Sequence, residues 1–252
     1  MASLKGPVVG LPSGKCGDIV YRIRYGESFM YKACQDFHKS ESDASRAIRE
    51  RMLVMAEFGS IVRSIPELYT IWKKSKVKAK AAYHKIQKFN AKIFDRKRPT
   101  INNRIVPDFG FLSPVSEIEF DSLGLYIKTE TDKLSETQHL IKKFIAINVI
   151  CVYEPISSEK KYFELFALRK DLGLCLTAVP LEINFQFEEE ISQLVSGYKK
   201  GIVYFELVPV DESGNPLIYS EYYSHEFDLE KAEEVSAVQD GWIDAGMEEA
   251  KR

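Results

Sequence analysis

The spacing of apolar residues along the chain changes from helical to strand-like near residue 100. From Ser42 to Ser64, apolar side chains recur every three or four positions, which predicts an amphipathic helix. A second helix is expected from about Pro66 to Phe94, because Pro66 suits a first helical turn and Ser64 is a candidate cap. Two helices joined so closely predict a helical hairpin within residues 36–98.

Residues 108–228 show the alternation of apolar and polar positions that is typical of strands. The expected strands are Ser116–Phe120, Leu123–Thr129, Phe144–Tyr153, Tyr162–Arg169, Leu174–Val179, Ile202–Val210 and Leu217–Tyr223, with a short helix at Phe187–Tyr198. Strands spaced this closely suit an antiparallel, Ig-like β-sandwich better than a parallel sheet, which needs crossover helices. The whole pattern predicts an α+β fold in which Pro99–Pro107 is a linker.

Residues 1–35 are expected to form an extended arm followed by a β-hairpin. Six Gly and Pro residues before Asp18 disfavour a helix, whereas Asp18–Arg24 alternates, Tyr25–Ser28 is a turn and Phe29–Lys32 is a second strand. An arm with so few apolar side chains needs a partner surface to become ordered. We therefore expect an assembly arm that contacts a neighbouring subunit through Gly10, Ser13, Gly14, Lys15 and Gly17.

The Gly14-Lys15 pair does not predict a phosphate-binding loop. Such a loop needs four residues between its first glycine and Gly-Lys, and Gly10 is one residue too close. In addition, Cys16 replaces the hydroxyl that would bind magnesium.

The last segment, residues 229–252, is acidic and weakly amphipathic. Either an acidic tail or a docking helix fits this pattern. Because Trp242 beside Ile243 gives the segment apolar surface to bury, we favour docking, on its own sandwich or on another subunit.

The composition, with 45% hydrophobic residues among 252, is that of a globular protein. No apolar run approaches the roughly 18 residues of a membrane span, and Met1–Gly10 lacks the apolar region of a secretory signal, so we expect a cytoplasmic protein without membrane contact. The four cysteines (Cys16, Cys34, Cys151 and Cys175) and four histidines are scattered, which predicts reduced thiols. We expect no metal, no cofactor and no small-molecule substrate.

Charge is strongly segregated along the chain. Residues 1–105 carry 22 Lys and Arg against 9 Asp and Glu, whereas residues 106–252 carry 13 against 28. The positive charge concentrates on the second predicted helix and just after it, at Lys73, Lys74, Lys76, Lys78, Lys80, Lys85, Lys88, Lys92, Arg96, Lys97 and Arg98. These residues are candidates for binding an anionic partner. Three alternatives stay open: nucleic acid, with Tyr83, His84 and Phe89 as stacking groups; an acidic protein surface, including that of a neighbouring copy; or plain solvation.

The motif Gly10-x-x-Ser13-Gly14-Lys15-x-Gly17-Asp18-x-Val20-x-Arg22 resembles an uncharacterised domain-of-unknown-function family associated with Bacteroidetes and their phages. The later pattern Phe163-Glu164-Leu165-x-Ala167-x-Arg169, followed by Leu174–Pro180 and Ser220-Glu221-Tyr222-Tyr223, is similar to the strands that close that family. The resemblance spans roughly residues 8–227; Cys16 and the acidic tail depart from it. It implies the same architecture and a phage or mobile-element context, and it lends no activity.

These features predict a protein that is not an enzyme, since no nucleophile, base or paired carboxylates form a recognisable signature. We expect a structural, self-assembling protein, a subunit of a phage virion or phage-like particle. Its expected partners are copies of itself and other particle subunits, joined through the arm and the oppositely charged halves. The alternative is a nucleic-acid-binding accessory protein that uses the lysine-rich helix.

Overall fold

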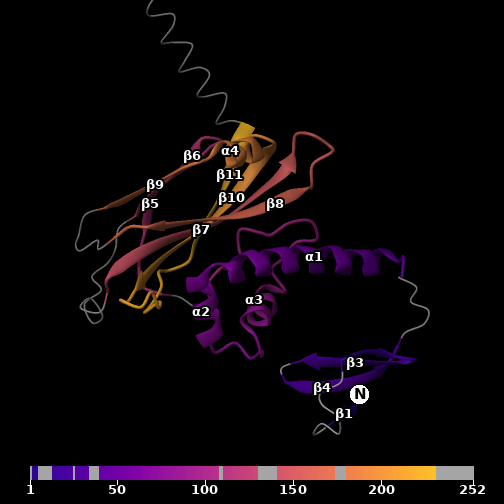
Figure 1. Cartoon of the computed structure of the whole chain (residues 1–252). Coiled ribbons are helices and arrows are strands. Elements are labelled where there is room, and N and C mark those ends of the chain that lie inside the picture. The colour runs from indigo at the N-terminus through magenta and orange to yellow at the C-terminus, as the bar shows by residue number, and fades with distance from the viewer. Residues whose placement is uncertain are drawn as a thin grey trace, which may run out of the picture. The chain divides into compact units, whose positions relative to one another are not determined.

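The chain forms a mixed α/β structure with antiparallel sheets, seen in a computed structural model (Figure 1). The structure describes residues 2–4, 13–24, 26–33, 40–107, 110–129, 141–173 and 180–230, and within them it has four helices and three sheets. The chain divides into two compact units, residues 1–46 and 47–252. The predicted α+β class is confirmed at this level.

The first unit is a four-stranded antiparallel sheet in the order β1-β4-β3-β2. Its strands are β1 (Ala2–Leu4), β2 (Gly14–Cys16), β3 (Ile19–Arg24) and β4 (Glu27–Lys32). The hairpin of β3 and β4 confirms the prediction. The sheet as a whole corrects the expected arm, because β1 pairs with β4 and β2 pairs with β3.

Most of the residues assigned to the arm belong to this sheet. Gly14 lies opposite Tyr21 and Lys15 opposite Val20 in the β2–β3 ladder, while Gly17 makes the intervening turn with a φ of 59°. A φ in this left-handed region favours glycine, so Gly17 is required by the turn. Ser13 is exposed just before β2. Gly10 lies outside the described residues.

Three helices replace the predicted pair. Helix α1 (Asp43–Ser64) matches the first prediction, but the second helix is split into α2 (Pro66–Lys74) and α3 (Ala82–Asn90). Ser75 ends α2 with an extended backbone, and its hydroxyl donates to the carbonyl oxygen of Trp72 at 2.8 Å. A continuous helix would also stack Lys74 on Lys78 and Lys76 on Lys80, and like charges four residues apart destabilise a helix.

The second unit contains two antiparallel sheets. One has the order β11-β10-β7-β8 and the other β5-β6-β9. The strands are β5 (Val115–Phe120), β6 (Gly124–Thr129), β7 (Lys143–Pro155), β8 (Phe163–Asp171), β9 (Leu181–Gln186), β10 (Tyr198–Val210) and β11 (Tyr223–Asp228), and α4 (Glu189–Val195) precedes β10. Five predicted strands and the short helix are confirmed; β9 was not predicted, and Leu174–Val179 lies outside the described residues.

The predicted strand Leu217–Tyr223 is wrong, because β11 begins only at Tyr223. The Ser220 hydroxyl accepts the hydrogen bond from the Leu207 amide at 2.9 Å, in place of a backbone carbonyl. On its other side the segment bonds to Phe111, whose amide donates to the Tyr219 carbonyl oxygen at 3.0 Å. These bonds interrupt the regular ladder with β10 until Tyr223.

The sheet of β7 and β10 is covered on both faces. On one face, Ile147 and Tyr204 pack with Phe58 of α1 and with side chains of α2 and α3; on the other, Ala146 and Phe205 pack with β6 and β9. A strand buried on both sides needs apolar residues at successive positions, which explains the long apolar runs of β7 and β10. The helices, this sheet and the second sheet therefore share one compact unit.

Residues 95–107 fasten the helices to the sheet. The Trp72 indole donates to the Ile105 carbonyl oxygen at 2.7 Å, and the Asn90 amide donates to the Arg104 carbonyl oxygen at 3.0 Å. Arg169 of β8 adds a bridge to the buried Glu67 of α2 at 2.8 Å. The expected linker Pro99–Pro107 thus lies inside the unit of residues 47–252 and does not separate two domains.

Candidate anion-binding surface

Two lysines hold the loop between α2 and α3 in place. Lys85 is buried, with 8% of its surface exposed, and its ammonium donates to the carbonyl oxygens of Lys73 at 2.9 Å and Ser75 at 2.7 Å. It therefore caps the last turn of α2, where the helix dipole favours a cation. The Lys88 ammonium donates to the Lys78 carbonyl oxygen at 3.0 Å. Lys85 was expected to bind an anionic partner, and this position corrects that prediction.

Apart from Lys85, the lysines of this region are exposed, including Lys88, whose ammonium bonds to the loop. We call them the lysine surface: Lys73, Lys74, Lys76, Lys78, Lys80, Lys88 and Lys92. Within the described part of the chain, the side chains of Lys73, Lys76 and Lys78 form no ion pair with a carboxylate. Because the loop backbone is fixed by Lys85 and Lys88, their charges are presented together to the solvent, as an anionic partner requires.

A groove of about 230 Å³ adjoins the lysine surface. Ile71, Lys74, Ser75 and Lys76 line one side, and Pro107 with the segment 216–219 lines the other. We call it the lysine groove. It combines apolar walls with two lysine residues, and it is smaller than the roughly 300–1,000 Å³ of small-molecule sites. A single large side chain suits it better than a cofactor.

The basic run Arg96–Arg98 does not join the lysine surface. Arg96 forms an ion pair with Glu50 of α1, and the Lys97 ammonium lies 5.2 Å from the centre of the Tyr162 ring. The Arg98 guanidinium lies 4.0 Å from the centre of the Tyr153 ring and bonds to Glu226 at 3.4 Å. These three cations therefore hold residues 96–98 against neighbouring elements.

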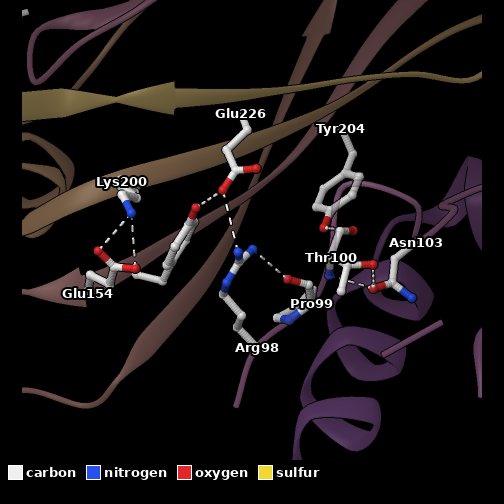
Figure 2. Close-up of polar contacts among 9 residues, drawn as sticks. Arg98, Pro99, Thr100, Asn103, Glu154, Lys200, Tyr204 and Glu226 are labelled. Carbon is white, nitrogen blue, oxygen red and sulfur yellow. Dashed lines mark hydrogen bonds and ion pairs between the residues drawn. The ribbon is translucent and has the colours of Figure 1, made fainter. Parts of the chain in front are cut away.

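Figure 2 shows how Arg98, the last residue of this run, is fixed on the sheet. The Tyr153 hydroxyl donates to the Glu226 carboxylate that also binds Arg98. Two residues after Arg98, the Thr100 carbonyl oxygen accepts a hydrogen bond from the Tyr204 hydroxyl of β10 at 2.7 Å. Arg98 also donates to the carbonyl oxygen of Pro99 at 3.3 Å. With its donors and its ring contact engaged in this network, Arg98 has a structural role.

The aromatic residues near the lysines are mostly part of the packing. Phe89 meets the Trp72 ring edge-on at 5.6 Å between centroids. Tyr83 lies against Gly59, where an added Cβ would come within 3.1 Å of its ring. Only His84, among the three expected stacking groups, is exposed. The surface thus offers charge in abundance and little aromatic area for bases.

The structure also shows a buried acid that was not singled out from the sequence. Glu206 on β10 is fully buried and accepts a hydrogen bond from the Ser220 hydroxyl at 2.9 Å, while its Oε2 has no hydrogen-bond partner among the described residues. Burial raises the pKa of the Glu206 carboxyl well above its usual range, since the bonds from Ser220 only partly offset it. The signal was present, because Glu206 is the only charged residue in the apolar run Ile202–Val210.

Metal-ligating and thiol side chains are scattered over the described residues. No cluster of three or more His, Cys, Asp or Glu side chains there is placed to hold a metal ion. Cys16 is exposed and Cys151 buried, both as free thiols, and burial raises the pKa of the Cys151 thiol. No helix among these residues is long and apolar enough to cross a bilayer.

Comparison with known proteins gives no relative from which to transfer a function. Neither a family model nor a curated protein matches this chain. Its function is therefore inferred from the residues and contacts described above.

Proposed function

We propose that this chain is a structural protein, and not an enzyme, that assembles with copies of itself as a subunit of a phage virion or phage-like particle. The main observation that supports this proposal is how few residues of the first unit are buried. Among its described residues only Ser28 and Ala33 are buried, while Ile19 is 38% exposed and Ile23 is 42% exposed. A small sheet with so little burial needs a further apolar surface for stability. A neighbouring subunit supplies it in this proposal.

The sheet edge offers a second means of contact. Among the described strands of this sheet, β2 is an exposed edge strand of three residues, so its outer backbone groups suit pairing with an added strand. In this proposal the glycine-rich N-terminus keeps its assembly role as a sheet, with Gly14 and Lys15 on the pairing strand. The charge segregation of the chain favours contacts between unlike surfaces of successive copies.

The context and the finer fold belong to the same proposal. The resemblance of the Gly10–Arg22 motif to the phage-associated family supports a particle subunit that first occurs in the bacterial cytoplasm. The two sheets of the second unit, which bury apolar side chains against each other, support an Ig-like sandwich. Virion proteins of other kinds and copies of this chain are its proposed partners.

Replacing Ile19 and Ile23 by Ser in the full chain tests the proposal. We expect the wild-type protein to sediment as oligomers, or to form rings, tubes or shells in electron micrographs, and the double variant to lose these species. The control is Arg22→Ser with Arg24→Ser, which changes the opposite side of the same strand. A wild-type chain that stays monomeric at all concentrations would contradict the proposal.

The lysine surface supports one alternative, a nucleic-acid-binding accessory protein. Seven exposed lysines are enough for strong electrostatic binding, which weakens steeply with salt. Retention on DNA or RNA that falls with rising salt, together with a monomeric chain, would favour this function over assembly.

A further inference from the structure

We propose that the acidic C-terminal segment of one copy docks in the lysine groove of a second copy, with Asp240–Asp244 as the inserted stretch. This inference rests on the proposed function and names one contact of the assembly. It is carried by three observations: the chemistry of the groove, the chemistry of the segment, and the place where the described chain ends.

The groove selects for an acidic segment with an apolar centre. Its walls include Ile71, Leu217 and Tyr219, and its cations are Lys74 and Lys76. Among the described residues no acidic side chain lines it, although Asp211 interacts electrostatically with Lys74 from outside the lining. An occupant with one large apolar side chain and flanking carboxylates would bury the first and pair the second.

The segment 231–252 has this pattern. It carries six Asp and Glu against three Lys and Arg, and its stretch Asp240-Gly241-Trp242-Ile243-Asp244 places two apolar residues between two carboxylates. Trp, with Tyr and Arg, is enriched among the side chains that carry most of the binding energy in protein interfaces. Gly241 leaves the backbone beside Trp242 without a side chain that would oppose close approach.

The chain leaves the sheet at the end remote from the groove. The groove lies beside residues 216–219, whereas the paired strands β10 and β11 end with Lys200 opposite Asp228, and Glu230 binds Lys199 at 2.8 Å. Residues 219 to 230 run along the sheet, so the two ends are on the order of 30 Å apart. Trp242 follows Glu230 by twelve residues, which reach about 40 Å when fully extended.

Docking on the same copy would thus require the twelve residues to stretch to about three quarters of their full reach, at a cost in conformational entropy. A second copy can approach without this restraint. Because the groove of one copy and the segment of another are different surfaces, the contact is heterologous and repeats along a ring or a filament.

A second groove, of about 370 Å³, is a poorer receptor for this segment. Its lining includes Leu53 and Phe163, the acids Glu50 and Glu57, and the cations Arg96, Lys97 and Lys161. Two of these cations already have partners, because Lys161 pairs with Glu164 at 3.4 Å and Lys97 lies over the Tyr162 ring. The two carboxylates of the lining repel an acidic occupant, and Arg96 at the same groove is already paired with Glu50.

Peptide binding tests the receptor site directly. The receptor is the full-length chain carrying Trp242→Ser and Ile243→Ser, and the probe is a fluorescent peptide of residues 229–252. We expect salt-dependent binding that weakens at least tenfold when Lys74→Glu and Lys76→Glu are added to the receptor. The matched control adds Lys73→Glu and Lys78→Glu, an equal charge change outside the groove lining, and should weaken binding less than threefold. A peptide of scrambled sequence controls for net charge.

Mixing full-length variants tests whether two copies are joined. The tail variant has an intact groove, and the groove variant has an intact tail. We expect neither to make the tail–groove contact alone, and a 1:1 mixture to gain a two-copy complex in sedimentation velocity that the separate variants lack. If the mixture gains no such complex, or if the scrambled peptide binds equally well, the inference is wrong.

Failure of this contact is distinguishable from failure of the proposed function. If both variants assemble as the wild type does, the inference is overturned while self-assembly stands. If the wild type is monomeric but the peptide binds the groove, the segment docks on its own copy, and both proposals are overturned. If the groove variant instead loses retention on DNA with no change in peptide binding, the surface binds nucleic acid and the inference is wrong.

Discussion

The loop lysines between α2 and α3 and the basic run Arg96–Arg98 carry the same charge in the same stretch of sequence, but the structure uses them differently. Lys76 and Lys78 are exposed and form no ion pair with a described carboxylate. Arg98 lies over a tyrosine ring and binds a carboxylate (Figure 2). Basic residues that lie close together in the sequence therefore do not all belong to one exposed cationic surface. What separates the two groups is whether the fold brings acids and rings to them.

Lys85 provides the strongest way to break this comparison, because it belongs to the lysine-rich stretch and is buried. We expect Lys85→Ala to lower the free energy of unfolding by about 3 kcal/mol, since two carbonyl oxygens at the end of α2 lose a charged donor and a buried stem is removed. Urea denaturation measures the loss. Lys78→Ala, the matched exposed lysine, should change stability by less than about 0.5 kcal/mol. Equal effects at the two positions would contradict the distinction.

Arg98 tests the basic run Arg96–Arg98, whose side chains contact acids and rings. We expect Arg98→Met to cost about 2 kcal/mol, because the variant keeps the apolar stem but loses the bond to Glu226 and the contact of the guanidinium with Tyr153. Thermal unfolding gives the value. Lys92→Met is the control in the exposed group, and there we expect no measurable change. If Arg98→Met left the stability unchanged, Arg98 would belong with the exposed lysines.

Glu206 extends the comparison to an acidic residue that is buried without a cationic partner among the described residues. Its pKa is raised in the folded state, so the unfolded chain loses the proton first as the pH rises above about 4.3, the usual pKa of glutamate. The carboxyl's contribution to stability is full below that pH and declines by up to about 1.4 kcal/mol for each pH unit, until the pH passes the folded pKa. We expect Glu206→Gln to remove this decline.

Chemical denaturation from pH 4 to pH 8 checks this expectation. The stability of Glu206→Gln relative to the wild type should rise steadily with pH over that range. Glu119→Gln, at an exposed position of β5, serves as the control and should follow the wild type throughout. A wild-type profile that runs parallel to that of the Glu206→Gln variant would mean that Glu206 is not held protonated.

The smallest effect on stability is expected from the exposed lysines themselves. Changing Lys73, Lys78 and Lys92 to Gln should leave the free energy of unfolding within about 0.5 kcal/mol of the wild type. The same change should lower the salt dependence of any binding to nucleic acid, by a slope of nearly one for each phosphate that is no longer neutralised by a lysine. An unchanged slope would show that these three lysines bind no phosphate.

Sequence patterns predicted the elements whose surroundings are uniform along their length. The α1 bounds follow from its helical period, because one face of α1 is buried, and the long strands β7 and β10 follow from their continuous apolar runs, because both of their faces are buried. The split between α2 and α3 was missed, since Leu68 through Ile93 keep a helical spacing across the break. What ends α2 there is Lys85, a residue ten positions beyond Ser75, and such a capping contact has no local signal.

The candidate surface was also predicted only in part, because some of its residues contact partners that are distant in sequence. Lysine content alone indicated a cationic face, and the exposed lysines from Lys73 to Lys92 form it. The roles of Lys85 and Arg98 depend on partners from other elements, such as Glu226, which is 128 residues away from Arg98 in sequence. The lysine groove also could not be predicted, because its second wall comes from residues 216–219.

The burial of β10 between two layers has a consequence for how the protein is made. During synthesis the helices α1 to α3 leave the ribosome first, and the strand that covers Phe58 follows roughly a hundred residues later. At about 5–20 residues per second, the apolar face of the helices waits on the order of ten seconds for its partner. During that interval the nascent chain exposes an apolar surface, which is a binding site for chaperones and is prone to aggregation. The yield of soluble protein should therefore depend on the speed of translation.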